Sequence, residues 1–137
     1  MMTLFDNSHF TLNPKVSICC ITYNHAKYIK RAIDSFINQK VNFDYEIIIG
    51  EDDSNDGTRE ICQDYALEYP DRIKLLLMDR TIDPLKKLGL YGNTNFIKTF
   101  KECRGKYIAI CEGDDFWLDV NKLQIQFDFL EKNQSFS

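Results

Sequence analysis

The chain has 137 residues, of which 44% are hydrophobic and 28% charged, and its formal net charge is −4 with a pI of about 5.1. These values are typical of one globular domain, and they exclude a general nucleic-acid-binding surface, which needs a basic face. No apolar run of about 18 residues predicts a transmembrane helix, and residues 1–14 read as a polar lead-in without the features of a secretory signal.

Short apolar runs alternate with helical patterns along the rest of the chain. The apolar runs have the length of strands, and they are residues 16–21, 45–49, 72–78 and 107–111. Apolar side chains recur at helical spacing in residues 25–39, 57–69 and 93–103, and in a last helix that we expect Asp119 to cap. Strands without polar alternation are typical of parallel sheets that are covered on both faces. The sequence therefore predicts a doubly wound α/β domain with a mostly parallel sheet and helices on both faces.

The five cysteines indicate neither a disulfide framework nor a metal site. Their number is odd and no CxxC pair occurs; they are Cys19, Cys20, Cys62, Cys103 and Cys111. Three of them lie in apolar strand patterns, where cysteine acts as a small buried residue in a reducing compartment. The two histidines, His9 and His25, are close to none of the cysteines in sequence, so no zinc site is predicted.

Two crowded acidic segments directly follow two of the predicted strands. They read EDDSND at residues 51–56 and EGDD at residues 112–115, and Thr22-Tyr23-Asn24 leaves a third strand. The carboxyl ends of parallel strands lie on one rim of a sheet, where ligands bind at the point at which the strand order reverses. We therefore expect the three segments to meet at one cleft. Because like charges at close range repel, a cation should balance them.

The predicted rim has no glycine-rich phosphate loop. Neither GxGxxG nor GxxxxGK[ST] occurs among the six glycines. An anionic nucleotide at this acidic rim would therefore need a divalent cation, and carboxylate oxygens suit Mg²⁺ or Mn²⁺. Asp114 and Asp115 are well placed to hold one. The alternative is a solvated acidic turn that caps the following helix.

The first acidic segment can bind a nucleoside without metal. An ionised Asp52 can accept the N–H of a base edge, and Tyr23 can stack on the base. Structural roles compete with this interpretation, because Asn24 suits a helix N-cap and Asp56 can cap the helix that begins at Gly57-Thr58. We read His25 as a surface residue at a helix start. Five basic residues either neutralise phosphate or form a solvated face; they are Arg80, Lys86, Lys87, Lys98 and Lys101.

Three segments together resemble the family 2 glycosyltransferases, which have the GT-A fold. They are VSICCITYNHAKYIKRAIDSFINQ, EIIIGEDDSNDGT and GKYIAICEGDDFW, beside family patterns of the kind VSIIIPTYN, EIIIVDDGSxDGT and GxYIxxLDxDD. The tail DFWLDVNKLQIQFDFLEKNQ is similar to a bacterial branch with EGDDYW followed by KLQ and a helix. The resemblance covers residues 15–137, and it implies a Rossmann-like, donor-binding domain.

The resemblance implies a hexosyltransferase-like enzyme that transfers a sugar from a nucleotide diphosphate donor, most often a UDP-sugar, with inversion. The residues that would contact the nucleotide are Thr22, Tyr23, Asn24, Glu51, Asp52 and Asp114. Asp115, with Asp114 in a shared role, would hold Mg²⁺ or Mn²⁺ through the DxD-type segment. The sequence departs from the family pattern at Ile21 for proline, at Glu51 and Asp53 for aspartate and glycine, and at Glu112 for the first aspartate.

The family's acceptor-binding half and catalytic base are expected beyond residue 137. We therefore expect either a chain truncated at its C-terminus or a stand-alone donor-binding domain. The leading hypothesis is a metal-dependent glycosyltransferase of bacterial cell-surface polysaccharide synthesis. It would act on a saccharide or lipid-linked saccharide acceptor, in the cytoplasm and at the inner face of the membrane through peripheral association. The alternatives are a non-catalytic module that binds a nucleotide or nucleotide-sugar, and a purely structural α/β domain.

Overall fold

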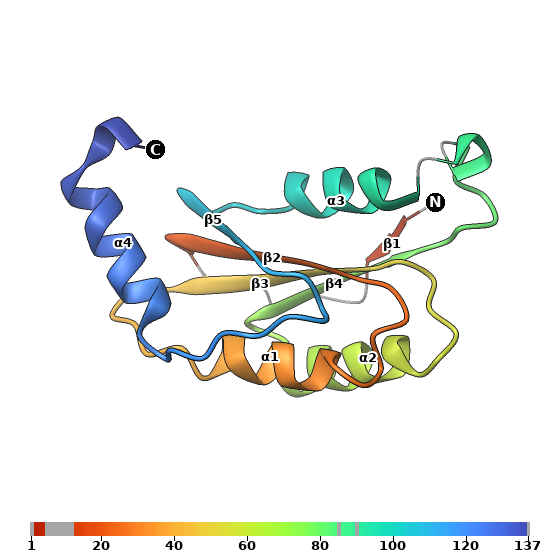
Figure 1. Cartoon of the computed structure of the whole chain (residues 1–137), viewed down its shortest axis with the longest axis horizontal. Helices are drawn as coiled ribbons and strands as arrows, with labels where there is room; N and C mark the ends of the chain where they lie inside the picture. The colour runs from red at the N-terminus through yellow and green to blue at the C-terminus, as the bar shows by residue number, and fades with distance from the viewer. Residues whose placement is uncertain (1, 5–12, 85, 90, 137) are drawn as a thin grey trace.

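The computed structural model describes residues 2–4, 13–84, 86–89 and 91–136, and its elements form a sheet covered by helices (Figure 1). The strands are β1 (Met2–Leu4), β2 (Val16–Thr22), β3 (Tyr45–Glu51), β4 (Ile73–Met78) and β5 (Tyr107–Ile110). The α-helices are α1 (Ile29–Ile37), α2 (Thr58–Glu68), α3 (Tyr91–Lys101) and α4 (Lys122–Lys132), with short 3-10 turns at Lys86–Leu88 and Gln134–Phe136. Helices α1 and α2 lie on one face of the sheet and α3 on the other (Figure 1).

The strand order β1-β4-β3-β2-β5 determines where a ligand can bind. Strands β2 to β5 pair in parallel, and β1 adds an antiparallel edge beside β4. From β2 the chain builds the sheet through β3 to β4, and it then returns to place β5 on the other side of β2. The strand order therefore reverses between β2 and β5, which is the usual ligand position in such sheets. The predicted doubly wound, mostly parallel α/β fold is confirmed.

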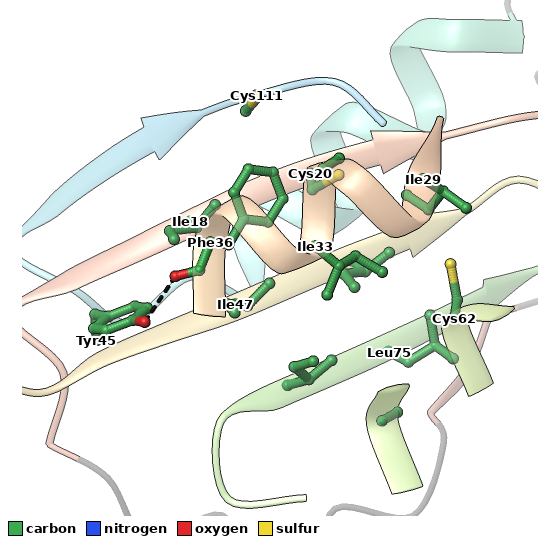
Figure 2. Packing of buried hydrophobic residues seen from close by; sticks show 14 of the residues in the cluster. Ile18, Cys20, Ile29, Ile33, Phe36, Tyr45, Ile47, Cys62, Leu75 and Cys111 are labelled. Atoms are coloured by element: carbon green, nitrogen blue, oxygen red, sulfur yellow. Dashed lines mark hydrogen bonds between the residues drawn. The ribbon is translucent and has the colours of Figure 1, made fainter. Parts of the chain in front are cut away.

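The main core lies between the sheet and the layer of α1 and α2 (Figure 2). Helix α1 buries Ile29, Ala32, Ile33 and Phe36, which share one face of a helix by their spacing. The hydroxyl of Tyr45 donates a hydrogen bond to the Phe36 carbonyl at 2.7 Å, and this bond ties the start of β3 to α1. The core packing fixes the strands whose carboxyl ends carry the acidic segments.

The cysteines are free thiols, as the sequence predicts for small buried residues. Cys20, Cys62 and Cys111 belong to the main core (Figure 2). Burial raises the pKa of the Cys111 thiol to about 11, so the thiol is protonated at neutral pH. None of the helices that the structure describes combines the length and the apolar character that a bilayer crossing requires.

Three local predictions were wrong. Helix α1 begins at Ile29 rather than near residue 25, so Asn24 is not its N-cap. Helix α4 begins at Lys122, and the Asp119 carboxylate accepts the Asn121 N–H at 2.8 Å instead of capping the helix. The polar lead-in contains β1, an edge strand paired with β4. The rest of that segment, residues 5–12 with His9, lies outside the described residues.

Candidate functional site

A pocket of about 250 Å³ lies at the carboxyl ends of β2 and β5, where the strand order reverses. Side chains from five separate segments meet there. They are Ile21, Thr22, Tyr23, His25, Asp52, Arg80, Asn95 and Glu112. The register places Thr22 beside Glu51 at the ends of β2 and β3, and the Asp52 N–H donates to the Thr22 carbonyl at 3.0 Å. The three rim segments predicted from the sequence therefore do meet at one site.

Glu51 lies beneath the pocket rather than in it. Its side chain is 0% exposed and forms an ion pair with Arg59 of α2. The carboxylate also accepts the Ser54 N–H at 2.8 Å, while the Arg59 guanidinium donates to the Met78 carbonyl at 2.7 Å. A buried carboxylate needs such a partner, because an unpaired charge in the interior is costly. Glu51 thus fixes the loop that carries Asp52, and the sequence prediction that it contacts a nucleotide stays a prediction.

Three of the side chains that line the pocket contact one another, namely Asp52, Arg80 and Tyr23. The Arg80 guanidinium donates to the Asp52 carboxylate and to the Asp52 carbonyl, each at 2.9 Å. The same guanidinium lies 3.4 Å from the centroid of the Tyr23 ring, in cation–π geometry. The pocket therefore presents an acceptor, a cationic donor and an aromatic face side by side. A planar group with a hydrogen-bonding edge is the ligand that such a set suits.

Asp53 and Asn24 shape the loops that follow β3 and β2. Asp53 has φ 64°, in the left-handed region, which glycine adopts most readily and which aspartate tolerates. Asn24, with φ 51°, accepts the Asn55 N–H through its side chain at 3.1 Å and donates its own N–H to the Ser54 hydroxyl at 2.9 Å. Asn24 thus connects the loop after β2 to the loop after β3, and it is not among the residues that line the pocket.

Asp56 joins the starts of α1 and α2. Its carboxylate accepts the N–H and the hydroxyl of Thr58 at 3.0 and 2.6 Å and the Ala26 N–H at 3.1 Å. The N-cap of α2 is Gly57, without a side-chain capping bond, so the prediction that Asp56 caps this helix was wrong. Burial alone would raise the pKa of Asp56, but the hydrogen bonds from Thr58 and Ala26 outweigh it and lower the pKa below its ordinary value. The ionised form is therefore the one that the fold stabilises.

We expect Asp56→Ala to destabilise the fold by about 1 kcal/mol, the usual net size of a lost intramolecular hydrogen bond, because its carboxylate bonds Thr58 and Ala26. Because the pKa of Asp56 is lower in the folded state, its stabilisation is present above the unfolded pKa, near pH 4, and is lost as pH falls through the folded pKa. The difference in free energy of unfolding between wild type and variant should therefore shrink below about pH 4. Urea unfolding at pH 7 and pH 3 measures both values, and a difference that stays constant would contradict this role.

The second acidic segment turns sharply past the end of β5. The Gly113 N–H donates to the Ile21 carbonyl at 2.9 Å, and the Asp115 N–H donates to the Glu112 carbonyl at 3.1 Å. A Cβ on Gly113 would lie 2.5 Å from the Thr22 hydroxyl oxygen, so only glycine allows the loop to approach β2 this closely. Glu112 lines the pocket, whereas Asp114 and Asp115 are exposed on the turn beside it.

The exposed carboxylates fit a divalent cation only in part. Among the described residues no three His, Cys, Asp or Glu side chains converge on one point, so a complete protein cage for a metal is absent from that part of the chain. Mg²⁺ and Mn²⁺ do not need one, because they take one or two carboxylates and fill the remaining positions with water and substrate phosphate oxygens. Asp114 and Asp115 supply donors of that kind.

The structure adds to the pocket three polar side chains from outside the predicted rim segments. Arg80 was one of five basic candidates, and only the pairing of β4 with β3 places it against Asp52. His25 was read as a surface residue, although it follows the TYN segment directly. Asn95 reaches the pocket from α3, and its side-chain amide donates to the Gly50 carbonyl at 2.9 Å. No signal in the sequence singled it out.

The five basic candidates lie in different surroundings. Arg80 lines the pocket, whereas Lys98 pairs with Asp83 at 3.0 Å, and Lys87 and Lys101 are exposed. The side chain of Lys86 lies outside the described residues. A role in neutralising phosphate stays a prediction.

Comparison with known proteins gives one consistent result. The model of the family described as glycosyl transferase family 2 matches residues 17–136. An uncharacterised protein of Mycobacterium tuberculosis is 37% identical over 118 residues, which are 86% of this chain and 32% of that protein. The chondroitin synthase of Escherichia coli is 33% identical over 122 residues, 89% of this chain and 16% of the synthase. The chain thus spans about a third or less of the length of these relatives.

Solved structures show the same fold at lower identity. TarS of Staphylococcus aureus, residues 1–349 in complex with UDP, matches with a TM-score of 0.69 at 20% identity, over 88% of this chain and 33% of that one. The mannosyltransferase PcManGT of Pyrobaculum calidifontis, in complex with GDP-Man and Mn²⁺, matches with a TM-score of 0.66 at 22% identity, over 88% of this chain and 33% of that one. Both likenesses concern the fold of the sheet and its helices.

Proposed function

The chain belongs to glycosyltransferase family 2, and from this premise we propose that its pocket binds the nucleotide of an activated sugar donor. The observation that carries the proposal is the set of Asp52, Arg80 and Tyr23 at the reversal point between β2 and β5. An acceptor, a donor and an aromatic face together suit a nucleobase. The complexes of TarS with UDP and of PcManGT with GDP-Man support a nucleotide donor.

We assign the base edge to Asp52 and Arg80. The Asp52 carboxylate has about four lone-pair positions, so it can accept a base N–H while it still accepts from Arg80. The guanidinium of Arg80 can donate to a neighbouring carbonyl of the base. Tyr23 is 38% exposed, and part of its ring stays available for stacking. Uracil presents an N–H beside a carbonyl and is the base that we propose.

The ribose and the diphosphate would then extend toward the turn at Glu112–Asp115. Thr22 and Asn24 stay candidates for nucleoside contacts, and Asp114 for the ribose or the metal. Asp114 and Asp115 would hold Mg²⁺ or Mn²⁺, which, when bound, neutralises the diphosphate and stabilises the charge that develops on the leaving group. Arg80 contributes a positive charge to the lining of the same pocket.

The following proposal concerns the reaction of the whole protein and its place in the cell. We propose sugar transfer with inversion to a saccharide or lipid-linked acceptor in bacterial surface polysaccharide synthesis, at the cytoplasmic face of the membrane. The polysaccharide named in chondroitin synthase supports that direction. We assign no described residue as the general base that deprotonates the acceptor. A non-catalytic binding module would use the same pocket, and hydrolysis of a UDP-sugar by the chain distinguishes the two.

We expect Asp52→Asn to weaken UDP binding about tenfold to a hundredfold, because a hydrogen bond to a charged acceptor contributes about 1.5–3 kcal/mol. Calorimetric titration with UDP measures the loss. Asp64→Asn, which makes the same change on the exposed side of α2, is the matched control and should bind like wild type. Equal affinity of the Asp52 and Asp64 variants would remove Asp52 from the base site.

A further inference from the structure

His25 is held in place from two sides. Its N–H donates to the Thr58 hydroxyl at the start of α2, at 2.8 Å. Its carbonyl accepts from the N–H groups of Tyr28 and Ile29, each at 2.8 Å, in the turn that leads into α1. The backbone of His25 is therefore fixed by both helices that cover this face of the sheet. A residue fixed in this way can present its side chain in one direction.

The imidazole ring lies between the ends of β2 and β5. Its Nδ1 is 3.1 Å from the Thr22 hydroxyl oxygen, and its Nε2 is 3.9 Å from Oδ2 of Asp114. The ring is 22% exposed and lines the same pocket as Asp52 and Glu112. A Cβ added at Gly113 would lie 3.0 Å from Nδ1 of His25, which is a tight contact. The turn therefore packs closely against the ring.

The separation of Nε2 and Asp114 Oδ2 is too long for a hydrogen bond, which needs about 3 Å. Two donors about 2.1 Å from one octahedral cation stand roughly 3 Å apart when adjacent. The Asp114 carboxylate is therefore about 1 Å further from Nε2 than two adjacent ligands of one ion would be. Because Asp114 is about half exposed on a turn, its carboxylate can adjust.

The Thr22 contact is compatible with the tautomer that a metal ligand needs, because a hydroxyl can accept from a protonated Nδ1 as well as donate to an unprotonated one. With the proton on Nδ1, the ring donates to the Thr22 hydroxyl, and the lone pair of Nε2 faces Asp114. A histidine that binds metal usually donates its other N–H to a fixed acceptor, which sets the tautomer and the ring orientation. Thr22 is 2% exposed at the end of β2, so it is a fixed partner.

We infer that His25 would be a ligand of the divalent cation together with Asp114, and that it would make the site prefer Mn²⁺ to Mg²⁺. Imidazole nitrogen suits transition metals, whereas Mg²⁺ prefers an all-oxygen sphere and sheds water reluctantly. This inference rests on the proposed function, because it needs a cation that arrives with the donor diphosphate. It goes beyond that proposal by naming a nitrogen ligand and a metal preference.

Pulsed electron paramagnetic resonance of Mn²⁺ with UDP and the wild-type chain gives the most direct test. A directly bound imidazole should produce a nitrogen coupling at Mn²⁺, and this coupling should change character when the protein carries ¹⁵N-histidine. His25→Gln should abolish it. If the complex of the wild-type chain with Mn²⁺ and UDP shows no coupling from histidine, the inference is wrong. The proposed nucleotide site would be unaffected by that result.

The metal affinities give an independent test. In the presence of UDP, His25→Gln should weaken Mn²⁺ binding about tenfold to a hundredfold and should change Mg²⁺ binding less than about twofold. Lys27→Gln, an exposed residue two positions further on, is the control and should alter neither affinity. Equal losses for both ions would show that His25 only orients the turn, and would overturn the inference. A wild-type chain that binds UDP equally with and without metal would overturn the inference together with the metal part of the proposed function.

Discussion

Asp115→Asn and Asp114→Asn should each reduce metal-dependent UDP binding at least a hundredfold, to the level measured in EDTA. Both carboxylates lie on the exposed turn after β5, where hard oxygen donors can meet the phosphate-bound cation. An asparagine side chain keeps the shape but removes the negative charge that balances the cation. The melting temperature should stay unchanged or rise, because each change relieves repulsion among the acids of the turn.

The readout is calorimetric titration with UDP in Mn²⁺ and in EDTA, together with thermal unfolding of each variant. Asp64→Asn on α2 again provides the matched control, since it removes a carboxylate from an exposed surface away from the pocket. Wild-type affinity in both turn variants would refute the assignment of the cation to this turn. A large fall in melting temperature would instead assign these residues a structural role, as in the solvated-turn alternative.

Arg59→Met should destabilise the fold by about 3–5 kcal/mol, because it leaves Glu51 charged and 0% exposed without its cationic partner. The variant also loses the hydrogen bond from the guanidinium to the Met78 carbonyl at the end of β4. For a domain of this size the melting temperature should fall by about 10 °C or more. Urea unfolding gives the free energy, and thermal unfolding gives the temperature.

A double variant separates the charge effect from the packing effect. Glu51→Gln in the Arg59→Met background should recover about half of the loss, because the buried carboxylate becomes a neutral amide. Lys106→Met is the surface control. It breaks the exposed Lys106–Glu131 pair and should leave the free energy of unfolding close to that of wild type, because surface ion pairs contribute little. If Arg59→Met costs no more than Lys106→Met, Glu51 is not held by Arg59 in the way described.

The architecture follows from local patterns that the sequence displays. Apolar runs of strand length and helical spacing between them are enough to predict a parallel, doubly wound sheet, and the acids at the strand ends then fall on one rim. Helix starts are less predictable, because a suitable residue can find another partner. Asn24 could cap α1, but its side chain instead accepts the N–H of Asn55, more than thirty positions along the chain.

The charge balance of the first acidic segment could not be predicted, because its cations lie outside the segment, at separations of 8 positions for Arg59 and Glu51 and 28 positions for Arg80 and Asp52. Arg59 on α2 neutralises Glu51, and Arg80, after β4, neutralises Asp52. The pairing of Arg80 with Asp52 requires β4 to lie beside β3. Within the segment, Glu51 and Asp56 fix the loop and Asp52 lines the pocket.

The central claim is that this pocket binds the nucleotide of the donor together with a metal ion. Calorimetric titration of the wild-type chain with UDP, first in Mn²⁺ and then in EDTA, tests it most directly. The pocket described here predicts saturable binding with one site, and a large loss of affinity when the metal is removed. Absence of binding in both conditions, by a chain whose circular dichroism shows it to be folded, would contradict the claim that this pocket alone holds the nucleotide of the donor.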